Sequence, residues 1–363
     1  MKHTRNIHVR LLAIIVCLLI IPALYGASQI PERISDNDFW QMVSDFSEPD
    51  GSFNADNFVS NEILFQRLIP RLKEHGLGGA YIGVGPEQNF TYLTAIRPQI
   101  AFIIDIRRQA MLQHLLYKAI IELSADRADF LSFLFSRNRP AGPTADSSPA
   151  ELFDAYGKAL PDHALFERNL AAILKHLTGY HGFTLTGPDR HDIEYVYSAF
   201  FSYGPDLAYS FEPAVPTYAQ LMAASDRDGE NQSYLASEAN FQFVQKLQNN
   251  NLVIPIVGDF AGTKAMRAIA GYLKDHHAVV NSFYTSNVEQ YLFLQGNWDK
   301  FYVNVAQLPV NPDSVFIRWI PKGTRFASAL KRNINALCPI SEFMEAFSAG
   351  AIRTYRDVLT MTN

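Results

Sequence analysis

The feature that most constrains this fold is a pair of short, wholly apolar segments, residues 80–84 and 100–104, with a glycine-containing turn after the first. Such runs predict strands of a parallel sheet that is buried on both faces. Gly85 ends the first strand, and Pro86 suits the first turn of a helix, where its missing N–H has no partner to lose. We expect the helix over residues 87–96, and a long helix after the second strand, so the segment predicts a β-α-β-α unit.

The same rhythm returns in the second half of the chain. Strands are expected at residues 252–257, 278–285 and 315–320, and helices at 241–247, 263–273 and from Asn287, which Ser286 is expected to cap. A helical C-terminal region is expected after the last of these strands. We therefore predict an α/β fold with a doubly wound, mostly parallel sheet.

Two regions stand outside this rhythm. Residues 34–76 have apolar residues at helical spacing and predict helix, kinked or divided at Pro70. Residues 138–149 form a polar linker rich in Pro, Gly and Ser, and they open a mostly helical insertion that runs to about residue 230. Its aromatic residues suit either a lid over a ligand or ordinary core packing. We predict that residues 29–363 form a single α/β domain with this insertion.

The N-terminus has the three-part plan of a secretory signal. Lys2, Arg5 and Arg10 precede an apolar run over residues 11–24, and small residues at 26–28 suit a cleavage site. The run is shorter than the roughly 20 residues of a membrane span. Residues 1–28 are therefore predicted to be a signal peptide, with an uncleaved signal anchor as the alternative and the only expected contact with a membrane. The mature chain is expected to be exported, in the periplasm or outside the cell.

Composition excludes several classes of function. The 363 residues carry a formal net charge of -5 and no basic stripe, so nucleic acid is not an expected partner. A small molecule is the expected partner. The chain has only two cysteines, which excludes a disulfide framework or a cysteine-rich metal site. The polar run at residues 189–192 holds one His between two acids and lacks ligand spacing, so no metal is expected. No GxSxG or HExxH motif supports a hydrolase.

Ligands of open α/β sheets bind beyond the carboxyl ends of the strands. Asp105 ends the second strand about 20 positions after the first glycine of the turn, the spacing at which a Rossmann acid reaches a ribose diol. Glu87 stands in the first turn of the expected helix, where its charge would repel a pyrophosphate and favour a positively charged ligand such as S-adenosylmethionine. The predicted cofactor-binding residues are Gly83, Gly85, Glu87, Gln88, Asn89, Asp105 and Arg107.

Four of these residues also have a purely structural interpretation. The two glycines are equally suited to a tight turn without a ligand. Asp105 is equally able to cap a loop or to pair with Arg107 or Arg108. Glu87 is equally well explained as a carboxylate that stabilises the start of a helix.

The GxG turn, followed by an acid at the end of the next strand, resembles the core of the class I methyltransferases. The segments YIGVGPEQNFTYL, AFIIDIRR and FYTSNVEQYLF also resemble an uncharacterised bacterial family with that predicted core, over about residues 60–330 without the insertion. The resemblance implies cofactor contact near Gly83 and Gly85, with Asp105 on the ribose, and it adds no known reaction. The chain departs from the pattern at Tyr81, where an acid is usual, and at Glu87, where a further glycine is usual.

Asp259 and Tyr284 are the predicted catalytic residues. In the methyltransferase plan, the strand end that Asp259 follows often faces the methyl acceptor, and a carboxylate there suits a general base. A helix cap is the alternative role for Asp259, and a surface position near a helix start is the alternative for Tyr284. Residues 258–264 also resemble a phosphate loop, but their glycine spacing is wrong, so ATP is not expected.

The predicted signal and the predicted cofactor disagree, because S-adenosylmethionine is made in the cytosol. One hypothesis is a methyltransferase-like enzyme that binds S-adenosylmethionine or a related nucleoside, with the acceptor unknown. The other is an exported, non-catalytic binding protein on the same scaffold. Tyr81 and Glu87, as departures from the pattern, favour the second.

Overall fold

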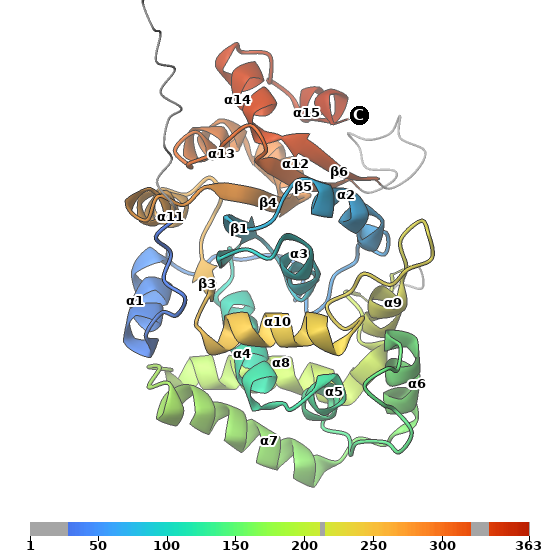
Figure 1. Ribbon diagram of the computed structural model, residues 1–363. Coiled ribbons are helices and arrows are strands. Elements are labelled where there is room, and N and C mark those ends of the chain that lie inside the picture. The colour runs from blue at the N-terminus through green and yellow to red at the C-terminus, as the bar shows by residue number, and fades with distance from the viewer. Residues whose placement is uncertain (1–27, 211–214, 321–333, 363) are drawn as a thin grey trace, which may run out of the picture.

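The computed structural model describes residues 28–210, 215–320 and 334–362 (Figure 1). The predicted signal peptide lies almost wholly outside these residues. None of the described helices is both long enough and apolar enough to cross a membrane.

One sheet organises the described part of the chain. It has six strands in the order β3-β2-β1-β4-β5-β6, and the first five in this order are parallel while β6 pairs antiparallel with β5. The α/β class and the mostly parallel sheet are therefore confirmed. The strands are β1 (Ala80–Gly83), β2 (Ile100–Asp105), β3 (Val253–Val257), β4 (Val280–Ser286), β5 (Val315–Ile320) and β6 (Ile334–Pro339).

Helices cover both faces of this sheet (Figure 1). One face carries α3 (Gln88–Ile96), α4 (Arg108–Leu123) and α10 (Glu238–Asn249), and the other carries α11 (Ala265–Asp275), α13 (Trp298–Val305) and α14 (Ile340–Ser348). Two shorter helices, α12 (Val288–Gln295) and α15 (Tyr355–Met361), pack on each other near the end of β4. Strands β1 to β3 are buried at every position, as their continuous apolar sequences predict.

The segment predicted as a helical insertion adds an outer layer to the α4 face. It contains α6 (Pro149–Lys158), α7 (His163–Lys175), a π-helical turn η2 (His176–Tyr180), α8 (Gly187–Tyr203) and α9 (Tyr218–Ala223). Helix α8 packs on α4 and on α5 (Arg127–Phe135), and α7 packs on α8.

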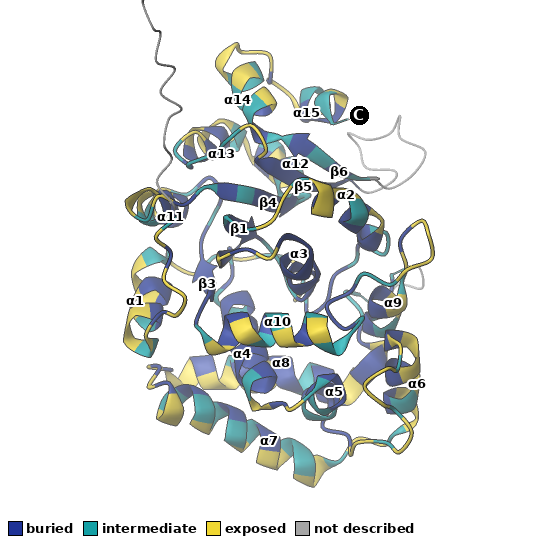
Figure 2. Ribbon diagram, viewed as in Figure 1, coloured by how far each residue is buried: buried dark blue, intermediate teal, exposed yellow. Residues whose placement is uncertain are grey.

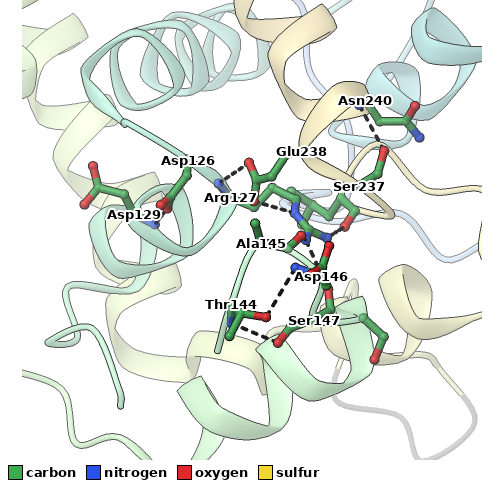
Figure 3. A network of polar contacts seen from close by, with 12 residues as sticks. Asp126, Arg127, Asp129, Thr144, Ala145, Asp146, Ser147, Ser237, Glu238 and Asn240 are labelled. Carbon is green, nitrogen blue, oxygen red and sulfur yellow. Dashed lines mark hydrogen bonds and ion pairs between the residues drawn. The ribbon is translucent and has the colours of Figure 1, made fainter. Parts of the chain in front are cut away.

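A single buried arginine fixes the polar linker that precedes this layer. The Nε atom of Arg127 donates to Glu238 at 2.8 Å, and its Nη1 atom donates to the carbonyl of Leu235 at 2.6 Å. Its Nη2 atom donates to the carbonyls of Ala145 and Ser147 at 2.6 and 3.1 Å (Figure 3). The linker is therefore bound to the start of α10, because these carbonyls complete the hydrogen bonding of a buried cation.

The N-terminal region differs from the prediction. Helix α1 spans Asp36–Phe46, a 3-10 turn η1 spans Phe65–Leu68, and α2 spans Ile69–Glu74 with Pro70 in its first turn. Residues 47–64 between them are almost entirely irregular. This segment contains three Asn, two Asp and three Ser residues, whose side chains favour turns over helix. The prediction of helix gave more weight to the apolar spacing than to these turn residues.

Two further expectations are wrong. The C-terminal region contains β6 as well as helices, because its six residues complete the sheet edge beside β5. Ser286 does not cap α12: its backbone has a φ of 49°, and its hydroxyl donates to Glu62. Asn287 occupies the cap position instead, without a side-chain hydrogen bond.

A buried ion pair joins α12 to β5. Arg318 Nη2 lies 3.0 Å from Glu289 Oε1, and the Tyr302 hydroxyl donates to the same oxygen at 2.7 Å. Both charged side chains are almost fully buried. Removing one member leaves an uncompensated buried charge, which costs much more than the pair itself contributes.

We predict that Glu289→Ala lowers the free energy of unfolding by about 3–5 kcal/mol, because Arg318 then stays buried without its partner. Urea denaturation measures the change. The matched control is Asp154→Ala, which removes the exposed pair with Lys158 on α6 and should cost at most about 1 kcal/mol. Equal losses in the two variants would contradict the assignment.

Candidate functional site

A cavity of about 210 Å³ lies at the carboxyl ends of β1 to β4. This is where the strand order turns back, between β1 and β4, and where ligands bind in open α/β sheets. Its other walls are the irregular loop 52–62 and helix α12. A cavity therefore lies at the sheet edge where the sequence predicts a ligand crevice.

Four of the predicted site residues line this cavity: Gly85, Asp105, Asp259 and Tyr284. They follow or end β1, β2, β3 and β4, so the parallel sheet brings them to one edge. Gly85 has a φ of 76°, a conformation that favours glycine, and no atom lies within 4 Å of where a Cβ would stand. The turn after β1 is therefore open on that side.

Asp105 faces the cavity and also binds Arg107. Its Oδ1 atom accepts from the backbone N–H of Arg107 at 3.1 Å and from its Nε at 3.4 Å. Burial raises the pKa of Asp105, and the nearby guanidinium partly opposes that rise. Asp105 lines the cavity, so its carboxylate is placed to meet a ligand there.

Arg107 does not line the cavity. Its Nη1 atom donates to the carbonyls of Ala55 and Asp56 at 2.6 and 2.7 Å. Its guanidinium also lies 5.8 Å from the ring centre of Phe53. Arg107 thus fixes the loop that covers the site.

Gly83 and Asn89 are turned into the protein. A Cβ on Gly83 would stand 2.1 Å from Asn89 Oδ1 and 2.8 Å from the Tyr81 hydroxyl, so packing alone requires the glycine. Tyr81 donates to Asn89 Oδ1 at 2.8 Å. The Asn89 amide in turn donates to the carbonyls of Val84, Gly85 and Pro86 at 2.7–3.0 Å. These residues hold the turn closed from within.

Glu87 and Gln88 are also buried and do not line the cavity. Glu87 Oε1 accepts from the backbone N–H of Ser60 at 3.2 Å, and its Oε2 has no partner among the described residues. Burial raises the pKa of Glu87 to about 8, so its carboxyl group is mostly uncharged at neutral pH. Glu87 thus lies inside the protein rather than at the cavity wall, where the sequence analysis expected its charge to meet a ligand.

Glu62 is the site residue that the sequence analysis missed. It lines the cavity and its carboxylate accepts from the hydroxyls of Tyr284 and Ser286, both at 2.6 Å. Its other oxygen accepts from the amides of Gln88 and Asn335 at 2.8 and 3.3 Å. Burial raises its pKa, and these four donors partly oppose the rise. The only sequence feature that could have pointed to Glu62 is the composition of residues 50–61, which is rich in turn-forming residues and indicates a loop beside the site.

The charges around the cavity are of one sign. Glu62, Asp105 and Asp259 line it, and none of the described lining residues is Lys, Arg or His. The walls also carry the aromatic side chains Phe53, Tyr209, Phe260, Tyr284 and Tyr291, of which Tyr209 comes from the aromatic insertion. Such a cavity suits a small ligand with a ring, hydroxyl groups and positive charge, and it disfavours phosphates.

The segment that resembles a phosphate loop binds a carboxylate of the protein itself. Glu48 accepts from the backbone N–H groups of Asp259, Lys264 and Ala265 at 3.0, 2.7 and 3.1 Å. The start of α11 is an anion site of the usual kind, and Glu48 fills it. A nucleotide phosphate would have to displace this side chain.

Comparison with protein families gives one match. A domain of unknown function, DUF7790, matches residues 57–144 and 186–347, which is more than half of the chain. The chain belongs to this family. A search of curated proteins finds no match. The DUF7790 match includes Glu62, Asp105, Asp259 and Tyr284, and it leaves out residues 145–185, which hold α6, α7 and η2.

The raised pKa of Glu87 predicts a specific pH dependence of stability. Between about pH 4.5 and 8 the folded protein binds more protons than the unfolded chain, so this residue's contribution is lost as pH rises. Gln resembles the protonated acid and does not titrate. We predict that the stability of Glu87→Gln, relative to wild type, increases with pH over this range by up to about 1 kcal/mol per unit.

Urea denaturation at several pH values between 5 and 8 measures this difference. The control is Glu342→Gln, which changes an exposed acid on α14 and should follow the wild type at every pH. Parallel curves for wild type and Glu87→Gln would show that Glu87 is ionised in the folded protein, contrary to this prediction.

Proposed function

We propose that the cavity binds S-adenosylmethionine or a related positively charged nucleoside, and that the protein is methyltransferase-like. The observation that carries this proposal is the charge of the cavity: three carboxylates and no described cationic side chain line it. A sulfonium or ammonium group is attracted by this field, whereas the phosphates of NAD or ATP are repelled.

The cavity walls suit the parts of such a nucleoside. The carboxylate of Asp105, which lines the cavity, is an acceptor for the ribose diol, because a carboxylate only accepts and a diol offers two donors. Aromatic rings such as Phe53 and Tyr291 suit stacking on a base. Gly85 allows the ligand to approach the backbone after β1.

Two groups are suited to the acceptor side. Asp259 follows β3 and uses its Oδ1 to accept from the backbone N–H of Ala261 at 2.9 Å. Tyr284 is hydrogen bonded to Glu62, and burial with this neighbouring acid raises the pKa of Tyr284 well above 10, so its phenol stays protonated. We assign Asp259 to orient or deprotonate the acceptor, and Tyr284, whose single proton is donated to Glu62, to accept a hydrogen bond through its phenol oxygen.

A non-catalytic, exported binding protein is the second candidate, and Asn89 favours it. Its amide occupies the carbonyls of Val84, Gly85 and Pro86, so the turn offers fewer acceptors to an ammonium group of the ligand. The turn of a methyltransferase-like core is here closed from inside by Asn89 and Tyr81. Both candidates share the same ligand crevice.

Calorimetry with S-adenosylmethionine, S-adenosylhomocysteine and ATP tests the ligand class. We expect micromolar binding of the sulfonium compound, weaker binding of its neutral thioether and no binding of ATP. Asp105→Ala should weaken nucleoside binding at least about tenfold, because it removes charge-assisted hydrogen bonds of roughly 1.5–3 kcal/mol each. Asp259→Asn should reduce the preference for the sulfonium about fivefold while preserving the Ala261 hydrogen bond.

The matched control is Asp313→Asn, which removes an exposed acid outside the cavity and should leave all affinities unchanged. Binding of ATP in preference to the sulfonium compound would refute the charge argument. An unchanged affinity in Asp105→Ala would refute the proposed position of the ribose.

The N-terminus of the protein isolated from its cells separates the two candidates. A chain that begins near Gln29 in an extracytoplasmic fraction is the result expected for the exported binding protein, because S-adenosylmethionine is made in the cytosol. An intact N-terminus on a cytosolic protein supports the enzyme and contradicts the predicted export. N-terminal sequencing of fractionated cells gives the answer.

A further inference from the structure

A second cluster of polar side chains lies where the end of α4 meets the π-helical turn η2. His176 Nε2 lies 2.7 Å from Glu122 Oε2, and His181 Nε2 lies 2.6 Å from the same oxygen. The three potential ligand atoms are within 4.8 Å of one another. None of these residues lines the cavity at the sheet edge.

The π-helical turn is what aims both histidines at one acid. Residues five apart on an α-helix point about 140° away from each other, because each residue turns the helix by about 100°. Here the N–H of His181 donates to the carbonyl of His176 at 3.0 Å, a five-residue closure that reduces this divergence. Turns of this type inside helical segments occur frequently at functional sites.

His181 has a carboxylate at each ring nitrogen. Its Nδ1 lies 2.7 Å from Asp36 Oδ1, and its Nε2 faces Glu122. A neutral imidazole has a single N–H, so one proton does not satisfy both contacts. When Nδ1 donates to Asp36, a second positive species is required between Nε2 and Glu122, and that species is either another proton or a metal ion.

Glu122 is prepared to act as a ligand. Its Oε1 accepts from Lys118 at 2.6 Å, which leaves Oε2 directed at the two histidines. The buried ammonium of Lys118 thus lies at one carboxylate oxygen, and the two imidazoles lie at the other.

We propose that Glu122, His176 and His181 bind a zinc ion, with Asp36 accepting the Nδ1 proton of His181. Two imidazole nitrogens and one carboxylate oxygen form a ligand set that zinc uses, with water in the fourth position. The Asp36 contact is the usual second partner of a metal-binding histidine. The side chain of His176 is 14% exposed, so the cluster lies close to the surface.

Zinc requires a small local movement. Ligand atoms around a tetrahedral zinc with bonds of about 2.0–2.1 Å are roughly 3.3 Å apart, so each N···O contact must lengthen by about 0.6 Å. His176 is the least buried of the three residues and has room to move. The ion then replaces the two protons that otherwise link the histidines to Glu122.

This site is separate from the function proposed above. Both histidines lie in residues 145–185, outside the DUF7790 match, whereas Glu122 lies inside it. The metal would link the matched domain, through α4, to the added helices and, through Asp36, to the start of α1. We infer a stabilising role, because an ion that binds only the folded state shifts the folding equilibrium.

Zinc binding by the full chain after chelator treatment tests the proposal. Calorimetry should show one ion per chain with micromolar affinity or better, and zinc should raise the melting temperature by several degrees. Cobalt(II) bound at the same site should give the visible absorption of tetrahedral coordination. His176→Gln and Glu122→Gln should each weaken binding at least tenfold and abolish both effects.

His176→Gln is the decisive variant because His176 is partly exposed and its replacement should preserve the fold, which circular dichroism checks. The matched control is His191→Gln on α8, an exposed histidine that should leave zinc binding unchanged. Zinc bound equally by wild type and His176→Gln would overturn the proposal, since that ion would be held elsewhere, as by His3 or His8. Absence of zinc binding to the wild type at 100 μM would overturn it as well.

Discussion

The carboxylate of Glu62 joins the parts of the molecule that form the cavity. It comes from the irregular loop after α1, and its four donors come from α3, β4 and β6, including Gln88 and Tyr284. A buried carboxylate without a cation is costly unless hydrogen bonds replace its water. Because Glu62 obtains these four donors from three different elements, the loop, the sheet edge and the phenol of Tyr284 are held in one arrangement.

The sheet could be predicted from the sequence because its central strands are buried on both faces. Their apolar runs located β1, β2, β3 and β5 to within one or two residues, and the carboxyl ends then placed Asp105, Asp259 and Tyr284 at one edge. Strand β6 has a mixed sequence, and its pairing depends on β5 already being in place. Glu62 could not be found in this way, because its partners are mostly distant in the sequence, more than 200 positions away for Tyr284.

Helix α3 shows why polar residues that the sequence analysis expected to face the cavity are instead turned into the protein. All nine of its residues are buried, since it is enclosed between the sheet and α10 (Figures 1 and 2). A polar residue in such a helix is not a surface residue, and it must find its partners inside. Gln88 and Asn89 do so by binding Glu62 and the turn after β1, and Glu87, at the cap position before the helix, accepts from the backbone N–H of Ser60.

The free-energy cost of burying several acids at this sheet edge bears on the function of the cavity. Burial raises the pKa of Glu62, Asp105 and Glu87 alike, and although Arg107 pairs with Asp105, no described Lys, Arg or His lines the cavity itself. Perturbed titratable groups in a cleft are typical of functional sites. A bound cation would favour the ionised forms and lower these pKa values, so the same charges that destabilise the free protein would contribute to ligand affinity. This link between the cost in the free protein and the gain on binding is a physical reason for a protein to retain such a cavity. It supports a positively charged ligand whether or not the protein catalyses a reaction on it.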